Sequence, residues 1–351
     1  MSYITEIVLK NYRSFVDARC RLSPFTLIVG ANNAGKSNLL RAVADLSVPN
    51  PFVRDVEIWN LVSHHGHKGQ PSEVSVLWDD SKITTTETAT TQDSEAAYEN
   101  FLLSLDADVS ERDRIVPSER HMLTKLSIYA FDPSLIGNAE PRSENPQLKA
   151  SGAGVSHILD KWNSGAKASR ERFARVVADL QRCVPEIEAL SFYDDNDGKR
   201  ALQAEQFGLP IPVPLSELSD GTRLVLAILT LVNLETPPPV ILLEDINRGL
   251  HPRLYEQVVS FLRTIANEGR TQILATTHDP YLIDEFADTP EAVVVVDKSD
   301  GASTLSNLDQ KLSAFLKPGA ELEMPLGELW FSGSLGGVPH MKVPTLIKAS
   351  A

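Results

Sequence analysis

Two glycines, a lysine and a serine near residue 35 have the types and spacing of a phosphate-binding loop. Residues 30–37 read GANNAGKS, which is the pattern G-x-x-x-x-G-K-S. Glycines let backbone N–H groups turn toward phosphate oxygens, the lysine reaches the β- and γ-phosphates, and the serine hydroxyl can ligate Mg²⁺. The candidate nucleotide-binding residues are therefore Gly30, Asn32, Asn33, Ala34, Gly35, Lys36, Ser37 and Asn38.

Two adjacent carboxylates, Glu244 and Asp245, follow the short apolar run 240–243, which three prolines precede. Such a run is typical of a strand buried on both faces of a parallel sheet, and ligands bind at the carboxyl ends of these strands. An ordinary acidic turn is the alternative. Beside a phosphate-binding loop, we expect Glu244 to serve Mg²⁺ together with Ser37, and Asp245 to act as the base that polarises water.

Two further segments could complete such a site. Residues 218–222, LSDGT, open a strongly apolar helix, and Ser219 and Gly221 lie where its N–H groups are exposed. His278 follows the predicted strand 272–276 and could donate to a γ-phosphate or to the attacking water. Taken singly, the first segment fits an ordinary capped core helix, and the histidine fits a structural role.

The elements that position these residues are a strand over 25–29 with a helix through Leu46, the strand over 240–243 and the strand over 272–276. About 200 residues separate the loop from the acid pair, which predicts inserted elements. We expect two strands within 72–90, one strand within 121–133, helices over most of 152–183 and a hairpin around residues 195–198. No sustained heptad pattern is present, so a long coiled coil is not expected.

Composition limits the classes of protein that are possible. The chain has 351 residues, 42% of them hydrophobic, a net charge of −14 and two cysteines. The charge disfavours broad nucleic-acid binding. No apolar run approaches the ~20 residues of a membrane span, and the first residues lack the pattern of a signal peptide. We therefore expect a cytoplasmic protein without membrane contact.

Together, these segments resemble the ABC-type ATPase heads of the SMC, RecF and OLD kind, and most of all the small stand-alone AAA-family (OLD-like) ATPases that lack a TOPRIM domain. The resemblance rests on LKNYRSF (9–15), the phosphate-binding loop, LSDGT, LLEDINRGLHP (242–252), TTHDPYLID (276–284) and LGELWFSGSLGG (326–337). In that reading LSDGT is the signature motif and the acid pair belongs to the Walker B motif.

The resemblance implies an α/β fold with a mixed central sheet, an antiparallel β-subdomain and an inserted helical subdomain. It implies one ATPase domain over 1–351, with an N-terminal lobe at 1–80, the insertion at 81–212 and a C-terminal lobe at 213–351. It also implies ATP and Mg²⁺ as ligands, Asp245, Glu244 and His278 as catalytic residues, and a homodimer that sandwiches ATP head-to-tail, with higher oligomers open. Ser219 and Gly221 would then contact the nucleotide of the partner subunit.

Several features depart from the family pattern. The acids stand in the order Glu-Asp rather than Asp-Glu or Glu-Glu, and the shorter base predicts slow hydrolysis. Asn247 and Arg248 fit a cross-subunit contact and a surface loop equally well. The sequence assigns no Q-loop glutamine, and Gln70 is a candidate. A histidine group at 64, 65 and 67 fits a surface turn better than a metal site.

Residues 279–351 are expected to hold one strand pair and a helix, which is too little for a TOPRIM nuclease. The resemblance therefore implies a separate effector protein, a TOPRIM-like nuclease or a toxin, regulated by this ATPase in bacterial antiphage defence. A RecF-like repair ATPase that binds DNA and a nucleotide-stabilised scaffold with little turnover are the alternatives.

Overall fold

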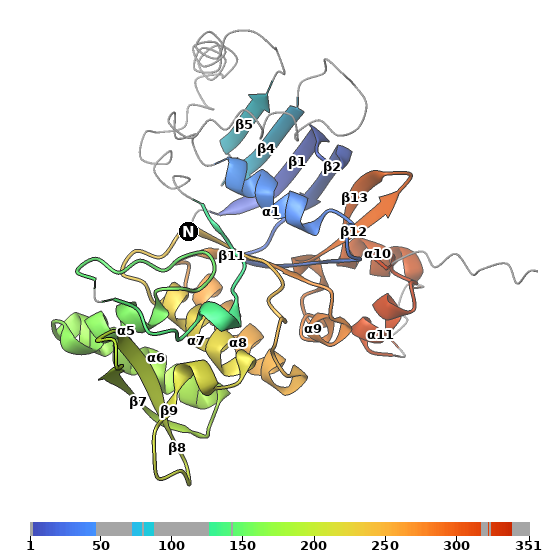
Figure 1. Cartoon of the computed structure of the whole chain (residues 1–351). Coiled ribbons are helices and arrows are strands. Elements are labelled where there is room, and N and C mark those ends of the chain that lie inside the picture. The colour runs from blue at the N-terminus through green and yellow to red at the C-terminus, as the bar shows by residue number, and fades with distance from the viewer. Residues whose placement is uncertain are drawn as a thin grey trace, which may run out of the picture.

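Ten strands of the described chain form one mixed sheet at the centre of the molecule (Figure 1). The structure is a computed structural model, and it describes residues 3–46, 72–78, 81–87, 126–141, 143–316, 322 and 324–338. In spatial order the strands are β5 (Ser81–Glu87), β4 (Ser72–Trp78), β1 (Ile4–Tyr12), β2 (Phe15–Arg21), β13 (Ala302–Asn307), β12 (Val293–Ser299), β3 (Phe25–Gly30), β11 (Gln272–Thr277), β10 (Val240–Leu243) and β6 (Ile128–Tyr129).

The sheet has a parallel half and an antiparallel half. Strands β12, β3, β11, β10 and β6 run parallel to one another, whereas β5, β4, β1 and β2 pair antiparallel. The hairpin of β12 and β13 joins the halves, because β13 pairs with β2 in parallel. The predicted mixed sheet with an antiparallel subdomain is confirmed, and β10 has the predicted bounds.

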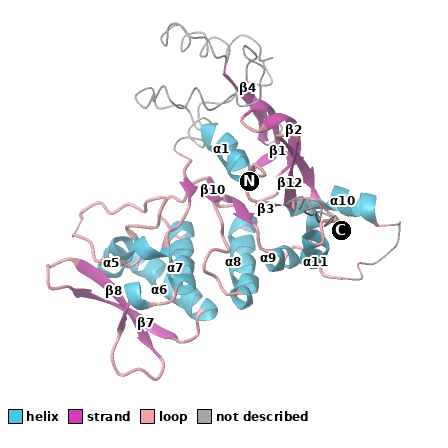
Figure 2. Cartoon of the chain, turned by 45° about the vertical axis from the view of Figure 1, so that its right-hand side comes forward, coloured by secondary structure: helices cyan, strands magenta, loops and turns pink. Residues whose placement is uncertain are grey.

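Helices cover both faces of the parallel half, as Figure 2 shows. On β3, Val29 points into the core beneath α8, whereas its neighbour Ile28 points into the core beneath α1. This alternation follows from the two-residue period of a strand, and burial on both faces explains why the strand sequences are continuously apolar. The helices are α1 (Lys36–Asp45), α5 (Val155–Ser164), α6 (Lys167–Cys183), α7 (Asp220–Val232), α8 (Tyr255–Asn267), α9 (Pro280–Asp284), α10 (Leu308–Phe315) and α11 (Leu326–Phe331).

The predicted helical insertion consists of α5 and α6, next to a second sheet of β7 (Ile187–Asp194), β8 (Arg200–Gln206) and β9 (Val213–Pro214). Helix α6 buries Val176 and Leu180 against the core, and its arginines point elsewhere. At 17 residues it is the longest helix within the described ranges, so these ranges hold no long coiled coil. None of the helices described there is long and apolar enough to cross a membrane.

Two expectations need correction. The strand expected within 121–133 is only two residues long in its described part, Ile128–Tyr129. The described part of the segment after His278 holds the expected strand pair, β12 and β13, but three α-helices rather than one: α9, α10 and α11. The extra helices are short, and each begins beside a proline or an asparagine, which weakens the periodic signal that a longer helix gives.

Candidate nucleotide-binding site

The phosphate-binding loop joins the end of β3 to the start of α1. A Cβ atom on Gly30 would lie 2.5 Å from the carbonyl oxygen of Val296, so only glycine fits against β12. Gly35 has a φ of 122°, which glycine adopts without strain, and it packs against Ser303. The Ser303 hydroxyl donates to the Ala34 carbonyl. Sequence analysis did not find Ser303, because β13 lies almost 270 residues along the chain from the loop it holds.

Lys36 is folded back along the loop. Its Nζ atom donates to the carbonyls of Gly30 at 2.8 Å and Ala31 at 3.1 Å. Burial lowers the pKa of the Lys36 ammonium below its ordinary value, and the negative charges of Asp245 and Glu244 oppose that shift. The Lys36 ammonium could exchange these backbone carbonyl oxygens for the phosphate oxygens of a nucleotide.

The two motifs meet at Ser37 and Glu244. The Ser37 hydroxyl donates to Glu244 Oε1 in a close contact, although the residues are 207 positions apart. A hydroxyl and a carboxylate are hard oxygen donors, and Mg²⁺ in nucleotide sites takes one or two such protein ligands while phosphate and water supply the rest. The pair therefore fits Mg²⁺. Asn38 lies beside it and donates to Ser14 at 2.9 Å, which ties α1 to the turn between β1 and β2.

Asp245 follows Glu244 in a left-handed backbone conformation, with φ at 50°. Its N–H donates to the Thr276 hydroxyl at 2.9 Å, which fixes the acid to the end of β11. His278 comes two residues after Thr276, and its Nδ1 lies 3.7 Å from Asp245 Oδ1. Both side chains are about half exposed, so a substrate and water can reach them. The structure thus brings Glu244, Asp245 and His278 to one end of two adjacent strands.

The loop after the acid pair is attached to the histidine segment. Asn247 is 9% exposed, and its Oδ1 accepts from the Thr277 hydroxyl at 2.8 Å. The expectation that Asn247 is a surface residue is therefore wrong, because its side chain is used inside the chain. The cross-subunit contact by residues 247 and 248 stays a prediction. Arg248 is exposed. Tyr255 at the start of α8 donates to Asp279 at 2.7 Å and adds a second tie to the same segment.

The signature segment starts α7. Ser219 is the N-cap, and its hydroxyl accepts from the Thr222 N–H at 3.2 Å. A Cβ on Gly221 would lie 2.9 Å from the carbonyl of Gly249, so the helix start packs tightly on the loop that follows the acid pair. Within the described residues, Ser219 and Gly221 make no hydrogen bond to residues 30–38. The structure therefore does not bring these two residues into the site formed by their own chain.

A strand that sequence analysis did not connect to the site lies beside the acid pair. Strand β6 pairs with β10, and the Glu244 N–H donates to the Tyr129 carbonyl at 2.8 Å. Residues 130–132, Ala-Phe-Asp, therefore occupy the next position along the edge of the sheet and include no glutamine. Gln70 and the histidines at 64, 65 and 67 lie outside the described residues.

The glycine-rich segment 326–337 lies close to the phosphate-binding loop and to the segment that follows His278. A Cβ on Gly337 would lie 3.6 Å from the Cα of Gly30, at the start of the phosphate-binding loop. A Cβ on Gly327 would lie 2.1 Å from the carbonyl of Pro280, two residues after His278. The segment 326–337 thus packs on both the loop and the histidine segment. The glycines in LGELWFSGSLGG indicate a close approach to some other part of the chain, but they do not indicate to which segment.

This fold is the fold of solved SMC head domains. A solved SMC head bound to the C-winged helix domain of ScpA superposes with a TM-score of 0.52 at 17% identity, covering 88% of this chain and 99% of that one. An SMC head with an extended coiled coil from Pyrococcus furiosus gives 0.50 at 14% identity, covering 90% and 98%.

The family follows from the sequence. Residues 25–284 match the family described as "AAA domain, putative AbiEii toxin, Type IV TA system", and the chain belongs to it. No curated protein matches the chain in sequence. The resemblance to ABC-type heads of the SMC kind is confirmed.

Proposed function

We propose that the chain binds and slowly hydrolyses ATP at this site. The contact between Ser37 and Glu244 carries the proposal, because it joins the phosphate-binding loop to the acid pair across 207 positions. Ser37 and Glu244 would hold Mg²⁺, which when bound neutralises charge on the β- and γ-phosphates. Gly30, Asn32, Asn33, Ala34, Gly35 and Asn38 would cradle the phosphates, and Lys36 would move from its carbonyl partners to the γ-phosphate.

Asp245 would accept the proton of the attacking water, and His278 would donate to the γ-phosphate or orient the water. The 3.7 Å between His278 Nδ1 and Asp245 Oδ1 supports a shared task. Asp245 is held by Thr276 and the histidine segment by Asn247, so the two groups keep their spacing without a substrate. Such preorganisation lowers the cost of aligning groups during the reaction.

We further propose that two copies pair head-to-tail around ATP, with Ser219 and Gly221 of each copy facing the nucleotide of the other. The start of α7 supports this, because its N–H groups and the Ser219 hydroxyl form an anion-binding end that contacts no part of its own phosphate-binding loop within the described residues. The division into lobes 1–80 and 213–351 with the insertion 81–212 belongs to the same proposal.

The biological role we propose is regulation of a separate effector, a nuclease or toxin, in antiphage defence. The family description, which names a putative toxin of a toxin–antitoxin system, supports a role of this kind. The SMC head solved with a domain of ScpA supports recruitment of a second polypeptide by such a head. DNA binding in a repair role is the alternative, and the net charge of −14 disfavours it.

The test is ATP turnover measured against protein concentration, with molecular mass determined in parallel with and without Mg-ATP. Specific activity that rises with concentration, together with an ATP-induced dimer, is the expected result. A monomer with concentration-independent turnover would refute the head-to-tail pairing but not hydrolysis. An ATP-bound oligomer without turnover would leave the scaffold alternative, and the absence of ATP binding would refute the whole proposal.

A further inference from the structure

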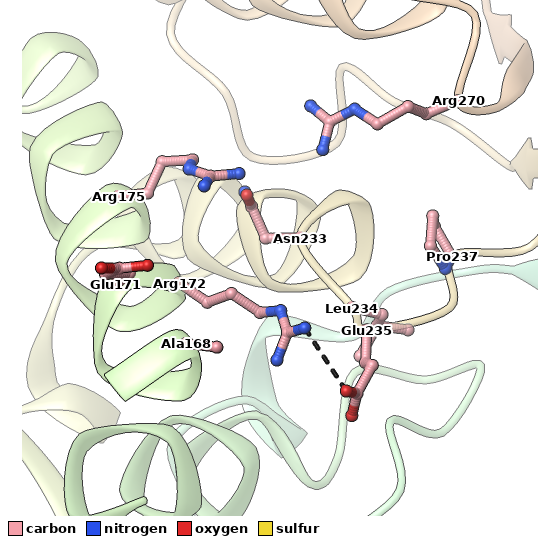
Figure 3. Close-up of a pocket in the computed structure, with 9 residues that line it drawn as sticks. All are labelled: Ala168, Glu171, Arg172, Arg175, Asn233, Leu234, Glu235, Pro237 and Arg270. Carbon is pink, nitrogen blue, oxygen red and sulfur yellow. Dashed lines mark hydrogen bonds and ion pairs between the residues drawn. The ribbon is translucent and has the colours of Figure 1, made fainter. Parts of the chain in front are cut away.

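A hollow of about 310 Å³ lies at the junction of the helical insertion and the central sheet. Helix α6 forms one wall, the loop after α7 forms the floor, and the turn before β11 forms the opposite wall. Three arginines line it, Arg172 and Arg175 from α6 and Arg270 from the turn (Figure 3). Its volume is in the range of pockets that bind small molecules.

The positive charge of the hollow is only partly balanced. Arg172 contacts Glu235 at 3.5 Å, a long distance to a carboxylate whose side chain is 79% exposed. Arg270 pairs with Glu268 in its own turn at 2.6 Å. Arg175 forms no hydrogen bond or ion pair within 4.0 Å among the described residues, although its charge acts on Asp179, which Arg182 contacts at 3.0 Å. The chain has a net charge of −14, so a cluster of three arginines from two separate elements differs from the negative charge of the chain as a whole.

A buried acceptor lies in the floor of the hollow. Asn233 is 3% exposed, and its Nδ2 donates to the Leu229 carbonyl at 2.9 Å. Its Oδ1 is buried and has no hydrogen-bond partner in the described part of the chain. Figure 3 shows this carboxamide next to the Arg175 side chain. Buried polar atoms are nearly always paired, so the floor lacks a hydrogen-bond donor. A hydroxyl group of a bound molecule could supply this donor, whereas its phosphate group would face the arginines.

We propose that this hollow is a second anion site, which binds a compact ligand bearing a phosphate group and thereby clamps α6 to the central sheet. Guanidinium groups bind phosphate oxygens through paired N–H donors, and arginines on opposite walls can share one phosphate. Glu171 and Glu235 line the same hollow and offset part of the arginine charge. A hollow of about 310 Å³ fits a small phosphorylated molecule rather than a nucleic-acid strand.

The position of the hollow connects it to the candidate ATP site. Asn233, the C-cap of helix α7, lies in the floor, and Ser219, the N-cap of this 13-residue helix, lies about 20 Å away at its other end. The loop of the floor leads into β10, whose other end carries Glu244. Arg270 precedes β11, whose other end leads to His278. A ligand in the hollow would hold the C-terminal end of α7 and the N-terminal ends of β10 and β11, and would thereby influence the proposed ATP chemistry. This influence on ATP chemistry rests on the proposed function, whereas the binding of the ligand does not.

The site is tested by titrating inorganic pyrophosphate into the full chain in a calorimeter without Mg²⁺. Two binding events are expected, one lost in Lys36→Ala and assigned to the phosphate-binding loop, the other lost in Arg175→Ala. The second event should weaken at least about tenfold in Arg175→Ala, since one hydrogen bond between charged groups contributes that much. It should strengthen in Glu235→Gln, which removes the competing carboxylate.

Arg170→Ala is the matched control, because Arg170 lies on the same helix, is exposed and donates to the Gly165 carbonyl outside the hollow. A wild-type titration with no event sensitive to Arg175 would overturn the proposal, and so would equal weakening in Arg170→Ala. A short DNA duplex that displaces pyrophosphate from this site would reassign it to nucleic acid. A wild-type titration that shows the event sensitive to Arg175 but none sensitive to Lys36 would count against the proposed ATP site and would still support the second anion site.

Discussion

The substitution Asp245→Asn tests the role of Asp245 as the catalytic base, because it removes the base while it preserves the structure of the site. Asparagine keeps the shape of the side chain and accepts the φ of 50° found at this position, since asparagine and aspartate are the residues that enter the left-handed region most readily. It cannot take a proton from water. Loss of a general base lowers turnover by about 10²- to 10⁴-fold, which corresponds to about 3–5 kcal/mol in the activation barrier.

The cost of the same change to the folded state is far smaller. The bond from the Asp245 N–H to Thr276 uses the backbone and remains. The contact with His278 at 3.7 Å joins side chains that are 45% and 52% exposed, and exposed pairs of this kind contribute about 0–1 kcal/mol. We therefore expect the free energy of unfolding to stay within about 1 kcal/mol while turnover collapses.

The assay is steady-state phosphate release, with molecular mass measured in Mg-ATP. Asp245→Asn should retain ATP binding and accumulate the ATP-bound dimer. Glu244→Gln is the informative comparison, because loss of the Mg²⁺-side acid should raise the Mg²⁺ concentration needed for half-maximal turnover, whereas Asp245→Asn should leave it unchanged. Turnover of Asp245→Asn within about threefold of the parent, a tenth or less of the expected loss, would falsify the assignment of Asp245 as the base.

Three further substitutions and one labelling experiment follow from the structure. Lys36→Ala should abolish ATP binding in a titration, and retained affinity would contradict its role. Ser219→Arg should keep ATP binding but remain monomeric in light scattering, and a dimer would exclude pairing through this residue. Gly337→Ala, at a φ of 74°, should lower the free energy of unfolding by about 1–3 kcal/mol, because its Cβ would lie 2.7 Å from Trp330 Nε1 and 2.8 Å from Val295 Cγ1; an unchanged denaturation midpoint would disprove this packing. Burial raises the pKa of the Cys183 thiol to about 11, so a thiol reagent at pH 8 should label it only after unfolding; rapid labelling of the folded chain would contradict this burial.

The parts of the site that sequence could predict are those within short segments. The loop at 30–37, the strand at 240–243 and the start of α7 each carry a local pattern of glycines, apolar residues or a capping serine, and the structure has these elements at the expected places. Such a pattern is formed by residues that are adjacent in the sequence, so a single sequence is enough to predict the element.

The parts that sequence did not reveal depend on contacts between distant segments. Ser303 holds Ala34, Gly337 approaches Gly30, and β6 enters the sheet beside β10. None of these residue types is unusual for its own segment, so no local pattern points to the partner. The same reason explains the wrong expectation for Asn247, because a loop asparagine is typically exposed until a distant hydroxyl, here that of Thr277, makes it an internal link.

The order of the two acids follows from the backbone that carries them. Glu244 continues from β10 and must reach Ser37 on α1, which the longer side chain does. The chain then turns through a left-handed conformation at residue 245, where a glutamate would be strained and an aspartate is accepted. The turn also lets the Asp245 N–H meet Thr276, so the shorter acid is bound to the strand that leads to His278. A short base is therefore the consequence of a tightly anchored turn, and slow hydrolysis would follow from the same geometry that fixes the base in place.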